Sequence, residues 1–234
     1  MASITTTASA DTAQVLLTGD GRPNQSELDF TLRLRRARLG LIVALVAVVM
    51  IFVSYSSAYV VRQGLPTLDP RTGTLVRDWL PLQLPNFLLV NTLILLVSTM
   101  AMELARRQAV RIAAAAGNLS RTATRAETDG MPWLALTAIL GLSFLAGQWL
   151  VWRELEASGF YVATSPSSSF FYLLTGMHGI HLLGGILALL AAGAASLLRK
   201  SALSRGVVVD ATAWYWHFMT FLWIYILCLL EFAR

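Results

Sequence analysis

Two histidines lie inside an otherwise uncharged apolar segment that reads FFYLLTGMHGIHLLGG over residues 170–185. His178 and His181 are three residues apart, so their rings project from one side of a helix. The same side continues with the small residues Gly185, Ala188 and Ala192. A ring on such a small-residue face points toward protein rather than toward lipid. Imidazoles in that position can bind a metal or hydrogen-bond to a neighbouring helix.

A metal site would need a third ligand, and His217 is the only other histidine. Three imidazoles could bind copper or zinc, and two from different helices could bind a haem iron. The segment order, however, puts His178 and His181 in the half of the membrane opposite to His217. The rings would then be roughly 10 Å or more apart along the membrane normal. We therefore expect neither a metal-binding nor a cofactor-binding site, nor a catalytic one, and keep a histidine-based metal or haem protein as the alternative.

The chain that must position these residues is far more apolar than a soluble domain. Hydrophobic residues make up 56% of its 234 residues and charged residues only 13%, whereas soluble domains have about 25% charged residues. Five stretches reach the roughly 20 apolar residues that a membrane span needs. We predict an all-α integral membrane bundle of five transmembrane helices within a domain of residues 30–234. The predicted helices cover about residues 38–61, 82–105, 131–153, 168–198 and 210–232.

Basic residues are concentrated in three of the segments outside the helices. The N-terminal tail and the loops after the second and fourth helices hold 5, 5 and 3 of the 18 basic residues. The positive-inside rule makes these segments cytoplasmic, so five spans place the N-terminus in the cytoplasm and the C-terminus on the outer side. Residues 1–29 are expected to form a disordered cytoplasmic tail. The divided basic residues give no reason to expect nucleic acid as a partner.

Polar residues inside the other spans suggest helix packing rather than transport. Glu103 and Asp210 fall at segment ends, where headgroups and water can solvate them, and a proton-coupled transporter usually needs a deeper acid. We hypothesise that Gln148 of the third helix joins His178 and His181 in an interhelical hydrogen-bonded set. The small residues Gly184, Gly185, Ala188 and Ala192 should permit close helix approach.

The aromatic group WYWHF opens the fifth predicted helix and contains Trp216 and His217. Tryptophans at span ends usually form an interfacial belt. Trp216 beside His217 is a stronger candidate for a specific packing or hydrogen-bonding role.

Four blocks of the sequence together resemble subunit III of the haem-copper respiratory oxidases. They are residues 84–105, 133–155, 170–185 and 214–218, with a weaker fifth at 50–62. The resemblance implies a subunit without redox centres, docked on a subunit I that holds haem and copper, with subunits II and IV as further partners. It implies bound phospholipids, support for proton uptake by the partner, and a location in the bacterial cytoplasmic membrane. The five-helix form is similar to a bacterial variant without two N-terminal helices.

Two positions depart from the pattern of this family. The family commonly has a buried glutamate where this chain has Val48, and it often continues HFVD where this chain reads HFMT, with Thr220 in place of the acid. Both changes remove an ionisable group and favour a stabilising, lipid-holding role. The resemblance leaves open whether the complex is an oxygen-reducing cytochrome c or quinol oxidase, or whether this chain is an accessory subunit of a nitric-oxide reductase.

Overall fold

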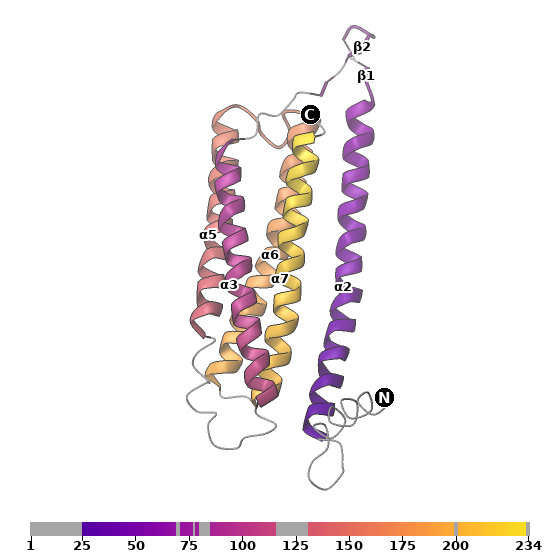
Figure 1. Ribbon diagram of the computed structural model, residues 1–234. Helices are drawn as coiled ribbons and strands as arrows, with labels where there is room; N and C mark the ends of the chain where they lie inside the picture. The colour runs from indigo at the N-terminus through magenta and orange to yellow at the C-terminus, as the bar shows by residue number, and fades with distance from the viewer. Residues whose placement is uncertain are drawn as a thin grey trace, which may run out of the picture.

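The computed structural model describes residues 25–68, 71–76, 78–79, 85–115, 131–198 and 201–232. Five long helices lie side by side in it (Figure 1): α2 (Gln25–Gly64), α3 (Phe87–Ala115), α5 (Met131–Ala157), α6 (Pro166–Leu197) and α7 (Ala202–Phe232). Each is long and apolar enough to cross a membrane. The predicted five-span helical bundle is confirmed, whereas the side of the membrane on which each terminus lies stays a prediction.

Successive helices run in opposite directions, so α2, α5 and α7 begin at the end drawn lowest in Figure 1, and α3 and α6 end there. We call this the lower end. Most predicted helices were too short, because the apolar stretch marks only the membrane-buried part of a helix whose hydrogen bonding continues into polar residues. The first helix begins at Gln25 rather than near residue 38, and the fifth at Ala202 rather than near residue 210. Of the predicted tail, residues 1–24 lie outside the described residues and residues 25–29 belong to α2.

Local sequence explains two of the helix starts. Ser165 caps α6: its hydroxyl accepts a bond from the Ser168 amide, the Ser168 hydroxyl accepts one from the Ser165 amide, and Pro166 follows. Such a capping box satisfies amides that the first turn leaves without helical partners. Helix α3 begins at Phe87, directly after a turn in which the Pro85 carbonyl accepts a bond from the Leu88 amide.

A short hairpin interrupts the helical fold and was not predicted. Strands β1 (Thr67–Leu68) and β2 (Leu75–Val76) pair antiparallel above the upper end of α2 (Figure 1), and Gly73 in the connecting segment has a φ of 65°. Arg62 of α2 donates to the Asp78 carboxylate, 2.5 Å away, and ties the hairpin to its helix. This hydrogen bond holds the pKa of Asp78 below its ordinary value.

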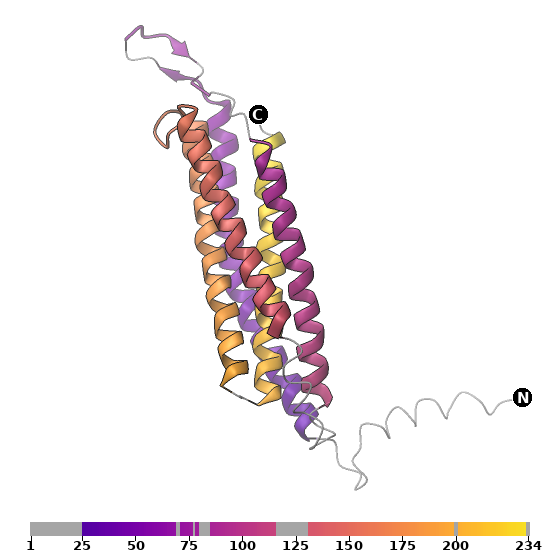
Figure 2. The same ribbon diagram turned by 90° about the vertical axis from the view of Figure 1, so that its left-hand side faces the viewer.

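The core lies among α3, α5, α6 and α7, whose aromatic and aliphatic side chains meet along the whole bundle. Helix α2 packs against α6 and α7 on one side of this group (Figures 1 and 2). Most of its apolar side chains stay exposed, including Val43, Met50 and Val61. The four-helix group therefore forms most of the core, to which α2 contributes the buried Phe52 and Tyr59 from one side.

Candidate functional site

His178 lies at the centre of the four-helix core and is fully buried. Its ring contacts Trp223 of α7 and Phe144 of α5, with ring centroids 5.1 and 6.0 Å apart. Neither ring nitrogen has a hydrogen-bond partner among the described residues. The structure thus places His178 as an aromatic packing residue that joins α5, α6 and α7.

His181 lies one turn further along α6 and is half-buried at the side that faces α2. Its Nδ1 is 2.7 Å from the carbonyl oxygen of Met177, and its ring packs edge-on with that of Phe52 at 5.8 Å. The carbonyl oxygen of His181 itself accepts a 2.8 Å bond from the Tyr215 hydroxyl of α7. His181 therefore contacts both α2 and α7.

Gln148 is 3% exposed, and neither its oxygen nor its nitrogen has a hydrogen-bond partner among the described residues. The direct hydrogen bonds expected between Gln148, His178 and His181 are therefore not formed. The physical reason is that Nδ1 of His181 bonds within its own helix, and His178 contacts aromatic faces. The glutamine amide is left without a bond from either ring.

Trp216 fills the space between three helices and is fully buried. A Cβ atom built on Gly141 of α5 would lie 2.7 Å from its Cη2, and one built on Gly185 of α6 would lie 3.2 Å from its Cε3. Glycine at both positions lets the indole approach both backbones. Gly185 and Ala192 face this core, whereas Ala188 is half-buried and Gly184 is exposed.

His217 of α7 faces α3. Its Nε2 is 3.2 Å from the Glu103 carboxylate, which also accepts bonds from Arg106 and Arg107. Within the described ranges, no group of three or more histidine, cysteine or acidic side chains lies close enough to hold a metal ion.

Asp210 is the acid that sequence reasoning placed wrongly. It was expected at a solvated segment end, but its side chain is 1% exposed and bonds to two arginines. Arg38 of α2 donates to both carboxylate oxygens at 2.8 and 2.9 Å, and Arg106 of α3 donates at 3.2 Å. Arg38 also lies over the Trp214 ring, 5.6 Å from its centroid. The early start of α7, eight residues before Asp210, is what brings this acid inside the bundle.

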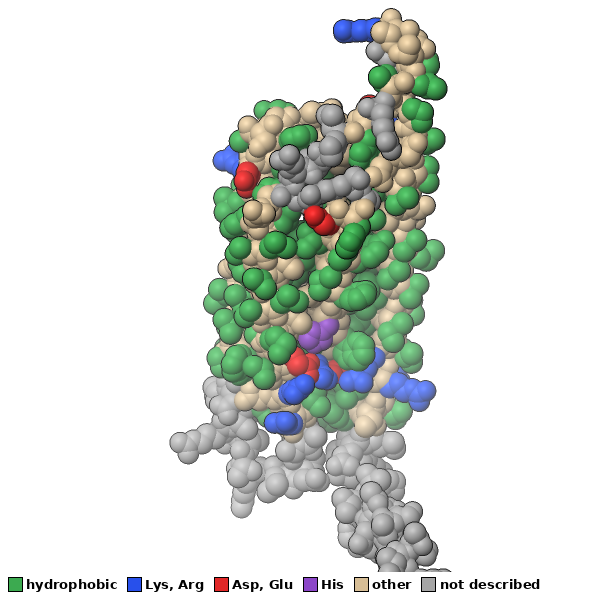
Figure 3. Space-filling model, turned by 45° about the horizontal axis from the view of Figure 1, so that its top comes forward, with side chains coloured by type: hydrophobic (Ala, Val, Ile, Leu, Met, Phe, Trp, Pro, Cys, Tyr) green, Lys and Arg blue, Asp and Glu red, His purple; other side chains and the backbone are tan. Residues whose placement is uncertain are grey.

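These charged groups form one network that we call the lower-end ionic cluster. Its members are Arg38, Glu103, Arg106, Arg107, Asp210 and His217. Figure 3 shows basic, acidic and histidine side chains gathered at this end, with hydrophobic side chains covering the middle of the bundle. A buried carboxylate that lost its partners would be strongly destabilising. The cluster therefore joins α2, α3 and α7 at one end.

Hydrogen bonds between polar side chains and neighbouring helices hold the core above this cluster. Asn91 and Ser98 of α3 donate to the backbone of α5, each at 3.1 Å. Thr220, which stands where the oxidase family often has an acid, lies 2.5 Å from Thr99, hydroxyl to hydroxyl. Val48, at the position of the missing glutamate, packs half-buried against the core. At both positions an uncharged side chain thus packs or hydrogen-bonds inside this chain.

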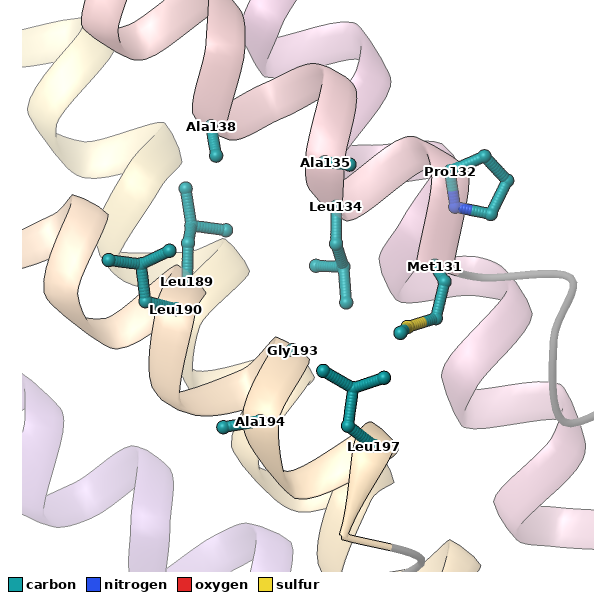
Figure 4. Close-up of a pocket in the computed structure, with 10 residues that line it drawn as sticks. All are labelled: Met131, Pro132, Leu134, Ala135, Ala138, Leu189, Leu190, Gly193, Ala194 and Leu197. Carbon is teal, nitrogen blue, oxygen red and sulfur yellow. The ribbon is translucent and has the colours of Figure 1, made fainter.

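An apolar hollow of about 480 Å³ opens between the beginning of α5 and the end of α6. Figure 4 shows its lining, in which Leu134 and Ala138 of α5 face Leu189, Gly193 and Leu197 of α6. A Cβ atom built on Gly193 would have no neighbour within 4 Å. The hollow has the size of a small-molecule site, and its lining is suited to hydrocarbon.

The fold and these sites define a multi-pass helical membrane protein whose polar residues connect helices. A family profile described as cytochrome c oxidase subunit III matches residues 29–232. This chain belongs to the cytochrome c oxidase subunit III family.

Individual relatives agree with this assignment. The chain is 29% identical to a cytochrome c oxidase subunit 3 of Synechocystis, over 94% of this chain and 83% of the relative. It is 31% identical to that of Triticum aestivum, over 81% and 65% respectively. It is 35% identical to a probable cytochrome c oxidase subunit 3 of Mycobacterium tuberculosis, over 44% and 50%. The matched region spans about half the length of that mycobacterial relative.

Proposed function

We propose that this chain is a non-catalytic subunit III of a haem-copper terminal oxidase in a bacterial cytoplasmic membrane. In this role it stabilises subunit I, which would carry haem and copper, and associates with subunits II and IV. The observation that carries the proposal is the family match, which runs through all five helices. The histidines support it, because each has a contact inside this chain: His178 with Trp223, His181 with Met177 and His217 with Glu103.

The lower-end ionic cluster suggests how the chain supports proton uptake by its partner. This end has the majority of the basic residues of the described helices, so the positive-inside rule favours the cytoplasmic side for it. Glu103 and His217 are 19% and 35% exposed there, so water can reach both side chains. Since Val48 replaces the buried glutamate of the family, we propose that this support comes from the cluster surface and not from a proton-binding group deep in α2.

The experiment that tests the proposal is affinity capture of the tagged chain from its native membrane in mild detergent. Optical spectra and subunit identification are made on the captured complex and on the chain stripped of its partners. Haem and copper in the complex, and neither on the stripped chain, are expected. Haem or metal that stays with the stripped chain would contradict the proposal and make the histidines candidate ligands.

We further propose that the hollow between α5 and α6 holds a phospholipid acyl chain. Its lining consists of apolar side chains and one glycine, and it lies within two predicted spans. Hydrocarbon chains gain about 0.8 kcal/mol for each CH₂ group that they bury away from water, but inside a bilayer the gain comes from shape and packing. A hollow with this lining favours a bound lipid tail over any polar ligand.

A matched pair of variants tests lipid binding. Gly193→Leu places a side chain in the hollow, and Gly40→Leu adds the same side chain to α2, where a Cβ atom also meets nothing within 4 Å. Native mass spectrometry of the purified complex should show fewer retained phospholipids for Gly193→Leu and an unchanged number for Gly40→Leu. Equal retention in both variants would show that the hollow binds no lipid tail.

A further inference from the structure

Three polar side chains of the four-helix core have atoms without a hydrogen-bond partner. Asn91 of α3, Gln148 of α5 and His178 of α6 are at most 3% exposed. Within the part of the chain that the structure describes, five of their atoms are unpaired: Oδ1 of Asn91, both amide atoms of Gln148 and both ring nitrogens of His178. Native proteins rarely leave such atoms unpaired, because burial removes their bonds to bulk water. These atoms therefore require a hydrogen-bonding partner.

Gln148 and His178 lie at the same level of the bundle. On α5, Gln148 is four residues after Phe144 and four before Trp152, so the three side chains share one face of the helix. Phe144 packs against the His178 ring at 6.0 Å, and Nε1 of Trp152 donates to the Thr175 hydroxyl at 3.2 Å. Because α5 and α6 run in opposite directions, Gln148 faces the turn of α6 between these two contacts.

Asn91 brings a third polar group to this level from α3. Its Nδ2 donates to the Phe144 carbonyl at 3.1 Å, and a Cβ atom built on Gly147 would overlap its Oδ1. Gly147 directly precedes Gln148, so the unpaired oxygen lies against the same turn of α5. Three helices thus each contribute one uncharged polar side chain to one level of the core.

Enclosure limits what the partner of these side chains can be. Residues that are at most 3% exposed cannot be reached by a lipid or by a helix of another subunit. One direct hydrogen bond between Gln148 and His178 would pair only two of the five atoms. A water molecule donates two hydrogen bonds and accepts up to two, so a single molecule can pair atoms of several side chains at once.

The helices leave space for such a molecule beside His178. Gly176 and Gly179 lie in the same turn of α6, and a Cβ atom built on either would meet the nearest side chain of α5 only at 3.7 or 3.9 Å. One built on Gly141, two turns from Gln148 on α5, would lie 2.7 Å from a core side chain. Packing between α5 and α6 is thus looser at the level of the unpaired polar atoms, which is where a buried water can be held.

We propose that the four-helix core binds water between Gln148 and His178, at the level of Asn91. In the neutral His178 ring one nitrogen donates to the water and the other accepts from it. The Gln148 amide supplies a second donor and acceptor, and Asn91 Oδ1 a further acceptor. The bound water links α3, α5 and α6 inside their membrane spans. This site is independent of the oxidase role, because all of its groups belong to this chain.

Proton-detected NMR of the full-length chain in phosphatidylcholine vesicles tests the proposal, with water itself as the probe. The protein is deuterated, labelled with nitrogen-15 and returned to H₂O, so that only exchangeable protons remain near the His178 ring. The ring resonances are assigned by their loss in a His178→Phe variant. We expect a cross-peak between the ring N–H and protons at the water frequency. A cross-peak only to the Gln148 amide protons would show a direct bond, and no cross-peak would show that no water is bound; either result overturns the proposal.

Two methionine variants test where the water is held. Gln148→Met keeps the length of the side chain and removes its amide, whereas Leu145→Met introduces the same side chain in the same turn of α5 without removing a polar group. The water cross-peak of His178 should be lost in Gln148→Met and unchanged in Leu145→Met. A cross-peak that persists in Gln148→Met would contradict binding between the two side chains. If Gln148→Met does not fold, the spectrum of the unmodified chain still decides whether His178 binds water.

Discussion

The four-helix core and α2 are held in place by different kinds of contact. In the most apolar stretch of α2, 17% of the residues are buried inside the protein, compared with 44% in that of α7. Helices α3, α5, α6 and α7 share fully buried aromatic residues such as Trp216, Trp223 and Phe144. Helix α2 instead depends on a few contacts at different depths, among them Arg38 with Asp210, Phe52 with His181, and Tyr59 with Phe170.

The difference indicates what each part can do. A core closed by aromatic packing maintains one arrangement, because its side chains interlock along the bundle. A helix with few specific contacts keeps its outer face free for lipid or for another subunit. Breaking α2 contacts should therefore loosen one helix, whereas overfilling the core should destabilise the whole bundle.

The largest effect is expected from Asp210→Ala. It leaves Arg38 and Arg106 without their shared carboxylate, and removal of one partner of a buried ion pair costs about 3 kcal/mol or more. The unfolding free energy in detergent should fall by about that amount, and hydrogen exchange should accelerate first in α2. Arg107→Gln is the control, because Arg107 is 62% exposed and bonds only at the rim of the cluster. Uniform acceleration of hydrogen exchange in all helices would contradict the proposed distinction between α2 and the core.

A smaller effect is expected from Gly141→Ala. The new Cβ would lie 2.7 Å from Cη2 of the buried Trp216, and overpacking of a core costs about 1–3 kcal/mol. Chemical unfolding should give a lower free energy of unfolding for this variant. The loss of stability should be no greater in α2 than in the other helices. Gly193→Ala, where no atom lies within 4 Å, is the matched control and should be neutral or slightly stabilising.

The hydroxyl pair between α3 and α7 should make a still smaller contribution. Thr99 and Thr220 are 2.5 Å apart, and interhelical hydrogen bonds in membranes average about 0.6 kcal/mol. A double-mutant cycle with Thr99→Val and Thr220→Val should return a coupling energy of that order. A coupling energy near zero would mean that Thr220 serves only through its bond to the Trp216 carbonyl.

The smallest effect concerns the hairpin and depends on pH. Because the bond from Arg62 lowers the pKa of Asp78, its stabilising contribution is present above the unfolded-state value of about 4 and is lost as the pH falls through the lower folded value. Exchange of the amides in residues 67–76 should rise on acidification relative to an Asp78→Asn variant at the same pH. Identical profiles in both proteins would show that the ion pair does not hold the hairpin.

The sequence by itself determined the five helices and the family. Uninterrupted apolar stretches of about 20 residues form α-helices in a bilayer, because their backbone groups must hydrogen-bond within the segment. The ends were harder to predict, since the polar turns at Gln25 and Ala202 continue helices beyond the apolar stretch.

The tertiary structure decided which partner each polar side chain has. Asp210 was read as a solvated group, yet Arg38 and Arg106 come from helices 172 and 104 residues away in the chain. Gln148 and His178 were expected to bond, yet His178 packs on Trp223 instead. Spacing along one helix indicates which face of the helix a residue occupies. The rotation of the neighbouring helices decides which side chains that face contacts.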